Sequence, residues 1–306
     1  MRNVQLMVSL GVLPHMHESV ITDPRWVTQF AQAMDEEGVE SIWTVEHVVV
    51  ANNYEPRYSY SESGRMPGAP GVVMPDPLEM LAFMASVTER VRLGTGVVVL
   101  PLHPPAVMAK RVATLDALSG GRVILGVGSG WQVEEYAACG VPYEGRGDRL
   151  DECIGALREL WAPGYRTYES NAASFYECES LPNPAQPGGP PIVIGGSTGR
   201  AARRAGRLGD GFYPYVISPE DYADRVALIR STAVEHGRDP DAIEMTVWPG
   251  SYQRGGSFDL GLIEKYAETG LDRLIVSAAE SGSADIDDIR RFVGRYHTEV
   301  LDKIGG

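Results

Sequence analysis

Short apolar runs rich in β-branched residues recur along the chain, and segments with helical periodicity separate them. Runs of this length are typical of buried strands, whereas apolar residues spaced three and four apart indicate one face of a helix. The runs are VQLMVSL, SIWTV, VRLGTGVVVL, RVILGVG, PIVIGG, GFYPY, EMTVW and RLIVSA. Because the runs are apolar almost throughout, we expect parallel strands covered by helices on both faces. About eight such βα units favour a closed (β/α)8 TIM barrel over an open sheet.

Helix starts are marked by a polar acceptor that directly precedes a proline, as in Asp23-Pro24, Asp76-Pro77 and Ser218-Pro219. The side chain of such an N-cap residue accepts a backbone hydrogen bond, and proline suits the first helical position. The first of these helices carries its apolar residues on one face and is expected to end at Gly38.

Two gaps between strands are too long for a simple βα unit. The first begins at Asn52, after the second strand, and is rich in Gly, Pro, Ser and Tyr. A long loop in a compact domain is usually functional or mobile, so we interpret this one as a lid on the substrate side. The second gap runs from Gly164 to about Pro190, after the fourth strand, and its FYECESL segment suggests a short hairpin. The sequence therefore predicts a single barrel domain over residues 1–306, with insertions after strands 2 and 4.

The composition of the chain indicates which kinds of partner the protein can bind. The 306 residues carry a formal net charge of −14, which opposes binding to nucleic acid or to an anionic membrane. The three cysteines have no C-x-x-C spacing, which suits a reducing cytoplasm, and no apolar run is long enough for a membrane span. We expect a cytoplasmic protein whose partner is a small molecule.

An anion site is predicted after the fifth strand, in the segment IGGSTGR. In a barrel of this kind, ligands gather at the C-terminal ends of the strands. Gly195 and Gly196 let the backbone turn its N–H groups outward, Ser197 and Thr198 supply hydroxyls, and a helix N-terminus follows. The alternative is an ordinary capped helix with solvated arginines. The four arginines of this helix are Arg200, Arg203, Arg204 and Arg207.

Glu46 and His47 form a carboxylate–imidazole pair after the second strand. Imidazole exchanges protons near neutral pH, and a carboxylate can fix its tautomer, so both residues are candidate catalytic groups. Adjacent residues on a strand point to opposite faces, however. In the alternative interpretation, one of the two faces the site and the other makes a structural bond. No His, Asp or Glu spacing resembles a metal site, and none is expected.

The stretch RVILGVGSGWQVEEY resembles a dinucleotide-binding turn only in part. That turn requires a third glycine, which allows close packing of helix on strand, and Trp131 stands in its place. The glycines of Gly94-Thr95-Gly96 lie within the preceding strand and suggest a bulge or a close approach to a flat ligand.

Taken together, VRLGTGVVVLPLHPP, RVILGVGSGWQVEEY and PPIVIGGSTGRAARRAGRLGDGFYP resemble the luciferase-like monooxygenase family, and within it the class that uses the deazaflavin coenzyme F420. The resemblance covers residues 1 to about 215. It implies a TIM barrel whose third strand carries a non-prolyl cis peptide, here Gly96-Val97. The cofactor-binding residues that it implies are Thr95, Gly96, Val97, Gly128, Ser129 and Gly130 for the ring and Gly195, Gly196, Ser197 and Thr198 for the phosphate.

The resemblance also implies the chemistry. Glu46 and His47 would lie near the reactive carbon of the cofactor and act on the substrate, while Trp43, Trp131 and Tyr54 suggest a flat or apolar substrate. The sugar-phosphate dehydrogenases of the class have an acid where Trp131 stands, so a sugar phosphate is not expected.

The leading hypothesis is an oxidoreductase that transfers hydride between C5 of F420 and an organic substrate. The glutamate at position 46, directly before His47, resembles the FMN-dependent branch of the family. The alternative is therefore an FMN-dependent monooxygenase that receives reduced flavin from a partner reductase. A flavin-binding barrel without turnover is a third possibility, and a homodimer is expected in any case.

Overall fold

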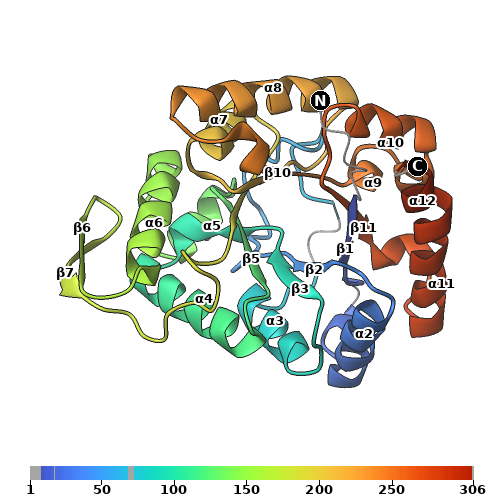
Figure 1. Cartoon of the computed structure of the whole chain (residues 1–306), viewed down its shortest axis with the longest axis horizontal. Helices are drawn as coiled ribbons and strands as arrows, with labels where there is room; N and C mark the ends of the chain where they lie inside the picture. Colours follow the sequence, from blue (N-terminus) through green and yellow to red (C-terminus); the bar gives the residue numbers. More distant parts are fainter. Residues whose placement is uncertain (1–7, 17, 68–71, 305–306) are drawn as a thin grey trace. The chain divides into compact units, whose positions relative to one another are not determined.

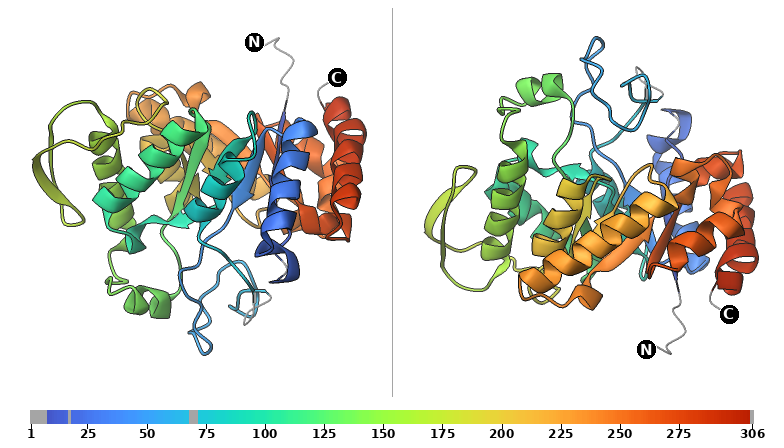
Figure 2. Two further views of the ribbon diagram at one scale, coloured as in Figure 1. Left: turned by 90° about the horizontal axis from the view of Figure 1, so that it is seen from below. Right: turned by 90° about the horizontal axis from the view of Figure 1, so that it is seen from above.

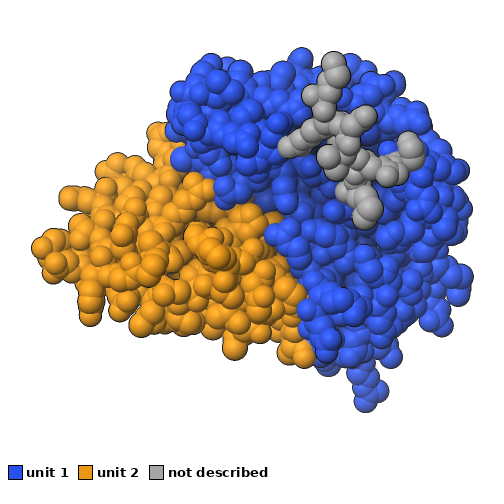
Figure 3. All heavy atoms as spheres, in the orientation of Figure 1, with its two compact units in different colours: residues 1–43, 87–92, 193–306 blue, residues 44–86, 93–192 orange. Residues whose placement is uncertain are grey.

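The computed structural model describes residues 8–16, 18–67 and 72–304. Two compact units make up the chain: unit 1 contains residues 1–43, 87–92 and 193–306, and unit 2 contains residues 44–86 and 93–192 (Figure 3). The single domain over residues 1–306 stays a prediction.

Unit 1 contains most of the parallel strands. Hydrogen bonds join β1 to β2 and β11, β11 to β10, β10 to β9 and β9 to β8, and Ser9 lies opposite Arg273 in the β1–β11 register. The residues of these strands are almost all buried. The strands are β1 (Ser9–Leu13), β2 (Ser41–Thr44), β8 (Ile192–Gly195), β9 (Gly211–Tyr213), β10 (Glu244–Val247) and β11 (Arg273–Ser277).

The helices of unit 1 begin where the sequence predicts them. The Asp23 side chain accepts from Arg25 N, the Ser218 side chain accepts from Asp221 N, and Gly38 follows the first long helix with φ 73°. The α7 and α8 helices pack side by side (Figure 1). The helices are α1 (Glu18–Ile21), α2 (Pro24–Glu36), α7 (Gly199–Leu208), α8 (Pro219–Glu235), α9 (Pro249–Tyr252), α10 (Leu260–Ala267), α11 (Ile286–Tyr296) and α12 (Asp302–Ile304).

Unit 2 contains the predicted third strand in two pieces, β3 (Arg92–Thr95) and β4 (Val98–Val99), which both pair in parallel with β5 (Val123–Gly128). The Asp76 side chain caps the helix that precedes β3, as predicted. The helices are α3 (Pro77–Ala85), α4 (Pro105–Ser119), α5 (Val133–Ala138) and α6 (Arg146–Trp161).

The predicted fold class is confirmed. In chain order, the parallel strands and the helices between them belong to a closed (β/α)8 barrel, in which β3 and β4 together count as one strand. Each of the eight predicted runs overlaps a strand; the part of the first run before Val8 lies outside the described residues.

Both predicted insertions are present. After β2, residues 45–76 contain no helix or strand in their described part, and this segment is the long blue loop in Figure 2. After β5, the chain forms α5 and α6 and then an antiparallel hairpin of β6 (Arg166–Glu169) and β7 (Ser174–Cys178), which includes the FYEC residues of the predicted hairpin. Across the described ranges, no helix has both the length and the apolar character that a membrane span requires.

Candidate active site

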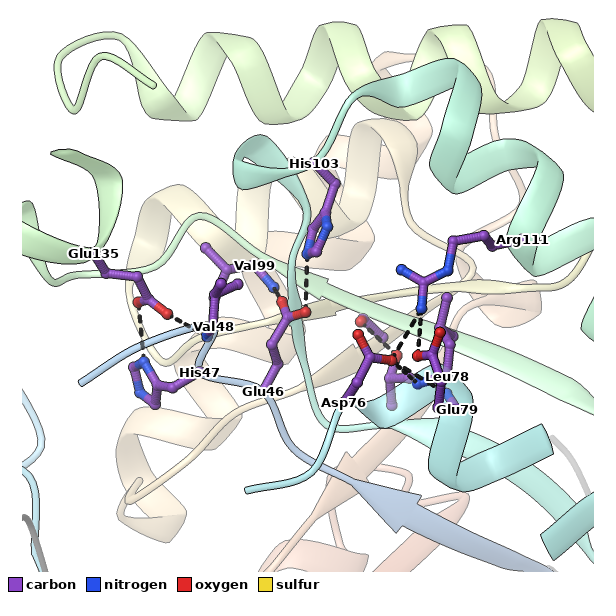
Figure 4. Close-up of polar contacts among 12 residues, drawn as sticks. Glu46, His47, Val48, Asp76, Leu78, Glu79, Val99, His103, Arg111 and Glu135 are labelled. Carbon is purple, nitrogen blue, oxygen red and sulfur yellow. Dashed lines mark hydrogen bonds and ion pairs between the residues drawn. The ribbon is translucent and has the colours of Figure 1, made fainter. Parts of the chain in front are cut away.

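Glu46 is the first titratable residue after β2, in unit 2, and its side chain is buried. Its Oε2 accepts from Val99 N at 2.6 Å, and its Oε1 lies 2.8 Å from Nε2 of His103 (Figure 4). Because an ionised carboxylate only accepts, His103 donates through Nε2. Glu46 therefore ties β4 to the loop after β2, and its imidazole partner is 57 positions away in the sequence.

His47 points to a different partner (Figure 4). Its Nδ1 lies 3.0 Å from Oε2 of Glu135, and Oε1 of the same glutamate accepts from Val48 N at 2.7 Å. Glu135 is fully buried, whereas 10% of the His47 side chain is exposed. The idea that Glu46 fixes the tautomer of His47 is therefore wrong, because each of the two residues bonds to a partner from another element.

Glu135 was missed by the sequence analysis, although it lies in the quoted stretch after the glycine-rich turn. It belongs to a set of three side chains around the start of α5 that bind the insertion after β2. Gln132 accepts from Ala51 N at 3.1 Å and Glu134 accepts from Glu55 N at 2.9 Å. The first part of this insertion is therefore held by hydrogen bonds, and its role as a lid stays a prediction.

A cluster of aromatic rings centred on Trp131 lies beside His47 in unit 2. The Trp131 ring lies edge-on to His47 at 5.7 Å, to Tyr54 at 5.0 Å and to Tyr58 at 5.1 Å between centroids. Tyr54 is only 5% exposed. Two of the three predicted substrate residues, Trp131 and Tyr54, are thus brought together beside the predicted catalytic histidine.

Trp43, the third predicted substrate residue, lies in unit 1 and is fully buried on β2. Its Nε1 donates to Ser41 Oγ at 2.7 Å, and its ring packs edge-on against Tyr213. The guanidinium of Arg273 lies over the same ring. The indole N–H is therefore bonded within its own strand, and a substrate contact would have to be made by the ring.

The glycines of the stretch RVILGVGSGWQVEEY face the preceding strand. A Cβ on Gly126 would lie 1.8 Å from the Thr95 carbonyl oxygen, and one on Gly128 would lie 2.8 Å from a Val97 methyl carbon. Gly130 has φ 62°, and a Cβ there would lie 2.6 Å from Val99. These glycines allow close packing of β5 on β3 and β4, which accounts for a glycine pattern that does not fit a dinucleotide turn.

The glycine-rich turn is fixed by hydrogen bonds to its carbonyls. Thr95 Oγ1 donates to Gly126 O at 2.7 Å, and the Tyr136 hydroxyl donates to Ser129 O at 2.6 Å. Burial raises the pKa of the Tyr136 phenol well above its usual value, which keeps it a donor. The carbonyls of Gly126 and Ser129 are therefore both hydrogen-bonded by side chains, and the Thr95 hydroxyl is already used.

The predicted phosphate turn lies in unit 1 between β8 and α7. Gly196 has φ 111°, a value that side-chain-bearing residues rarely adopt, and its N–H donates to Tyr213 O. Thr198 caps α7 by accepting from Ala201 N, and the Ser197 hydroxyl bonds to both backbone groups of Tyr215. The Ser197 hydroxyl is thus bonded within the chain. Thr198 only accepts, from Ala201 N, so its own O–H and the N–H groups that precede Ala201 at the start of α7 are the donors that remain for an anion.

Arginines lie on the solvent side of α7, whose opposite face is buried alanine and glycine. Arg200 and Arg203 are exposed. A further arginine that the sequence analysis did not consider, Arg225 on α8, donates through Nε to Ser197 O at 3.1 Å and so lies at the turn itself. The geometry is compatible with the phosphate hypothesis and with a capped, solvated helix.

Comparison with known proteins decides the family. The model of the luciferase-like monooxygenase family matches residues 5–251. The chain belongs to this family. As a luciferase-like protein it is an enzyme of the oxidoreductase or monooxygenase type, as the sequence predicted.

Proteins similar to this luciferase-like chain include F420-dependent enzymes and a monooxygenase. An F420-dependent glucose-6-phosphate dehydrogenase of Amycolatopsis mediterranei is 33% identical over 193 residues, which is 62% of this chain and 53% of that protein. The monooxygenase RslO1 of Streptomyces bottropensis has a TM-score of 0.74 at 21% identity, over 97% of this chain and 99% of its own. The coenzyme F420-dependent tetrahydromethanopterin reductase of Methanopyrus kandleri has a TM-score of 0.73 at 17% identity, with the same coverage. At these identities the two structures establish the shared fold.

One backbone feature implied by the resemblance to the luciferase-like family is confirmed. The Gly96-Val97 peptide is cis, between β3 and β4.

Two glycines of this luciferase-like barrel should differ in their tolerance of alanine. Gly128→Ala places a Cβ against a methyl group that can shift, so we expect the free energy of unfolding to fall by about 1–3 kcal/mol. Gly126→Ala meets a strand carbonyl, which cannot move without breaking sheet pairing, so we expect a larger loss. Urea unfolding of both variants measures the difference, and equal losses would contradict the packing described for β5.

Proposed function

We propose that the protein is an F420-dependent oxidoreductase that transfers hydride between C5 of the deazaflavin and an organic substrate. The observation that carries the proposal is the environment of His47, whose Nδ1 is bonded to a buried carboxylate and whose ring lies beside Trp131. An imidazole held in this way can exchange a proton through Nε2. Members of the family that use F420 or FMN support a flavin-like cofactor, and the dehydrogenase relative favours F420.

The chain has groups that fit such a cofactor. For the phosphate, the donors are the first-turn N–H groups of the ten-residue α7, next to Gly196 in its unusual conformation. For the ring, the backbone of Gly96, Val97, Gly128, Ser129 and Gly130 is the proposed support. When bound, the cofactor would supply the hydride, and the protein would supply position and proton transfer.

On the substrate side, we assign proton transfer to Nε2 of His47. Trp131 and Tyr54, with Tyr58, would keep water from this nitrogen and select a flat or apolar substrate. Trp43 remains a proposed substrate residue, and because its indole N–H is bonded to Ser41, it would contact the substrate through the ring alone. Glu46 would act by holding His103 and β4, and the sugar phosphate named for the dehydrogenase relative is not assigned to this chain.

The second candidate is an FMN-dependent monooxygenase that receives reduced flavin from a partner reductase. The glutamate at position 46 favours this candidate, since a glutamate directly before the histidine resembles the FMN-dependent branch of the family. A homodimer and a cytoplasmic location remain predictions under both functions.

We expect apoprotein to bind F420 at least about tenfold more tightly than FMN, because the arginines of α7 can attract the polyglutamate tail that only F420 carries. Fluorescence titration of both cofactors into apoprotein measures the ratio. The deazaflavin chromophore without phosphate and tail is the control, and it should bind more weakly than F420. Submicromolar binding of FMN with no response to F420 would overturn the assignment.

A further inference from the structure

We propose that Glu135 is a positioning residue that fixes the tautomer of His47. This inference rests on the proposed function, in which His47 exchanges a proton with the substrate. It adds a residue that lies 88 positions from the histidine and belongs to another element, α5.

The two oxygens of Glu135 are both engaged. Oε1 accepts from Val48 N at 2.7 Å, which is the backbone group directly after His47, and Oε2 lies 3.0 Å from His47 Nδ1. Val48 N can only donate, so it sets the position of the carboxylate. One buried side chain therefore holds both the backbone and the ring of the histidine.

The bond determines where the proton of the neutral imidazole lies. A carboxylate accepts and does not donate, so Nδ1 must carry the hydrogen and Nε2 must carry the lone pair. Nε2 can thus accept a proton from a substrate or return one, as either direction of hydride transfer requires.

Neighbouring bonds keep this arrangement rigid. Gln132 and Glu134 bind Ala51 N and Glu55 N, so the start of α5 is attached to the loop of His47 at three points. The Trp131 ring lies nearly perpendicular to the imidazole, with 5.7 Å between the ring centroids. A change of tautomer at Nδ1 therefore cannot be relieved by a simple shift of the loop.

Glu135→Gln should invert the tautomer. The amide oxygen of the glutamine must face Val48 N, because that group needs an acceptor, and the NH2 group is then left facing Nδ1. Nδ1 would become the acceptor and the proton would move to Nε2. The variant keeps the volume and the hydrogen-bond count of the wild type but removes the lone pair from Nε2.

The experiment is 15N NMR of the histidine rings in apoprotein, with the His47 signals assigned by their absence in His47→Ala. We expect wild-type His47 to be protonated at Nδ1 and Glu135→Gln to be protonated at Nε2. Glu134→Gln is the matched control, because Glu134 is the adjacent carboxylate on the same helix and the amide oxygen of glutamine can still accept its hydrogen bond from Glu55 N. Its His47 signals should match those of the wild type.

Turnover gives the second measurement. We expect Glu135→Gln to lower kcat on the order of tenfold or more with the affinity for F420 unchanged, and Glu134→Gln to stay within about threefold of wild type. A merely structural role for Glu135 would lower thermal stability without inverting the nitrogen signals.

The same His47 signals in wild type and Glu135→Gln would overturn the positioning role and leave the F420 assignment intact. Inverted signals in a protein that binds no F420 would support the positioning role and reject the cofactor. The two failures are therefore distinguishable.

Discussion

Replacing His47 with alanine is expected to remove most of the turnover while the protein keeps its cofactor. His47 makes its bond to Glu135 through Nδ1, which leaves Nε2 as the proton-transfer atom of the proposed reaction. General acid–base catalysis by a positioned side chain is worth about 10²–10⁴-fold, so kcat should fall by about that factor. Kinetics with reduced or oxidised F420, combined with a cofactor titration, separate the loss of chemistry from a loss of binding.

His236→Ala is the control for His47→Ala. His236 donates through Nδ1 to the carbonyl oxygen of Thr232, in unit 1 at the end of α8, and it has no part in the proposed chemistry. Its loss should leave kcat within about threefold. If His47→Ala also stayed within about threefold, which is well under 1 kcal/mol of barrier, the proton-transfer role would be rejected.

Gly196→Val is expected to weaken cofactor binding on the order of 100-fold. The backbone of Gly196 has φ 111°, which a β-branched residue resists, so the turn before α7 would have to rearrange. The first-turn N–H groups would then lose their alignment, and charge-assisted hydrogen bonds to a phosphate contribute about 1.5–3 kcal/mol each. Isothermal titration with F420 gives the change in Kd.

Gly237→Val tests for a general effect of such a substitution. Gly237 also has a positive φ, 68°, and a Cβ there would have no neighbour within 4 Å. Its stability cost should resemble that of Gly196→Val without the loss of affinity. Arg203→Ala should weaken binding less, and its effect should shrink as salt rises, because an exposed charge is screened within about 10 Å. Equal binding by Gly196→Val and wild type would place the phosphate elsewhere.

The parts of the fold that depend on nearby residues were predictable from the sequence. Asp23 and Asp76 cap helices as predicted because an N-cap bond spans only two or three positions. The strands were recognisable because each one is a short apolar run whose burial on both faces leaves a local pattern. The predicted cis peptide followed from family resemblance and not from local chemistry.

The pairing within the candidate site could not be predicted in the same way. His47 and Glu135 are 88 positions apart, and Glu46 and His103 are 57 apart, so only the fold shows which carboxylate reaches which imidazole. Adjacency in the sequence suggested Glu46 as the partner of His47, although neighbouring side chains at a strand end diverge. Likewise, the composition of the turn at Ser197 indicated a phosphate-binding hydroxyl. In the structure, that hydroxyl bonds to the backbone of Tyr215, in the loop that follows β9.

A crystal structure of the protein with F420 is the most direct test of the proposed cofactor site. We expect the phosphate to lie at the Gly195–Thr198 turn, against the N–H groups of the first turn of α7, with Nε2 of His47 on the substrate side of the deazaflavin ring. A phosphate at the Gly128–Gly130 turn, or a ring remote from His47, would contradict the proposed function.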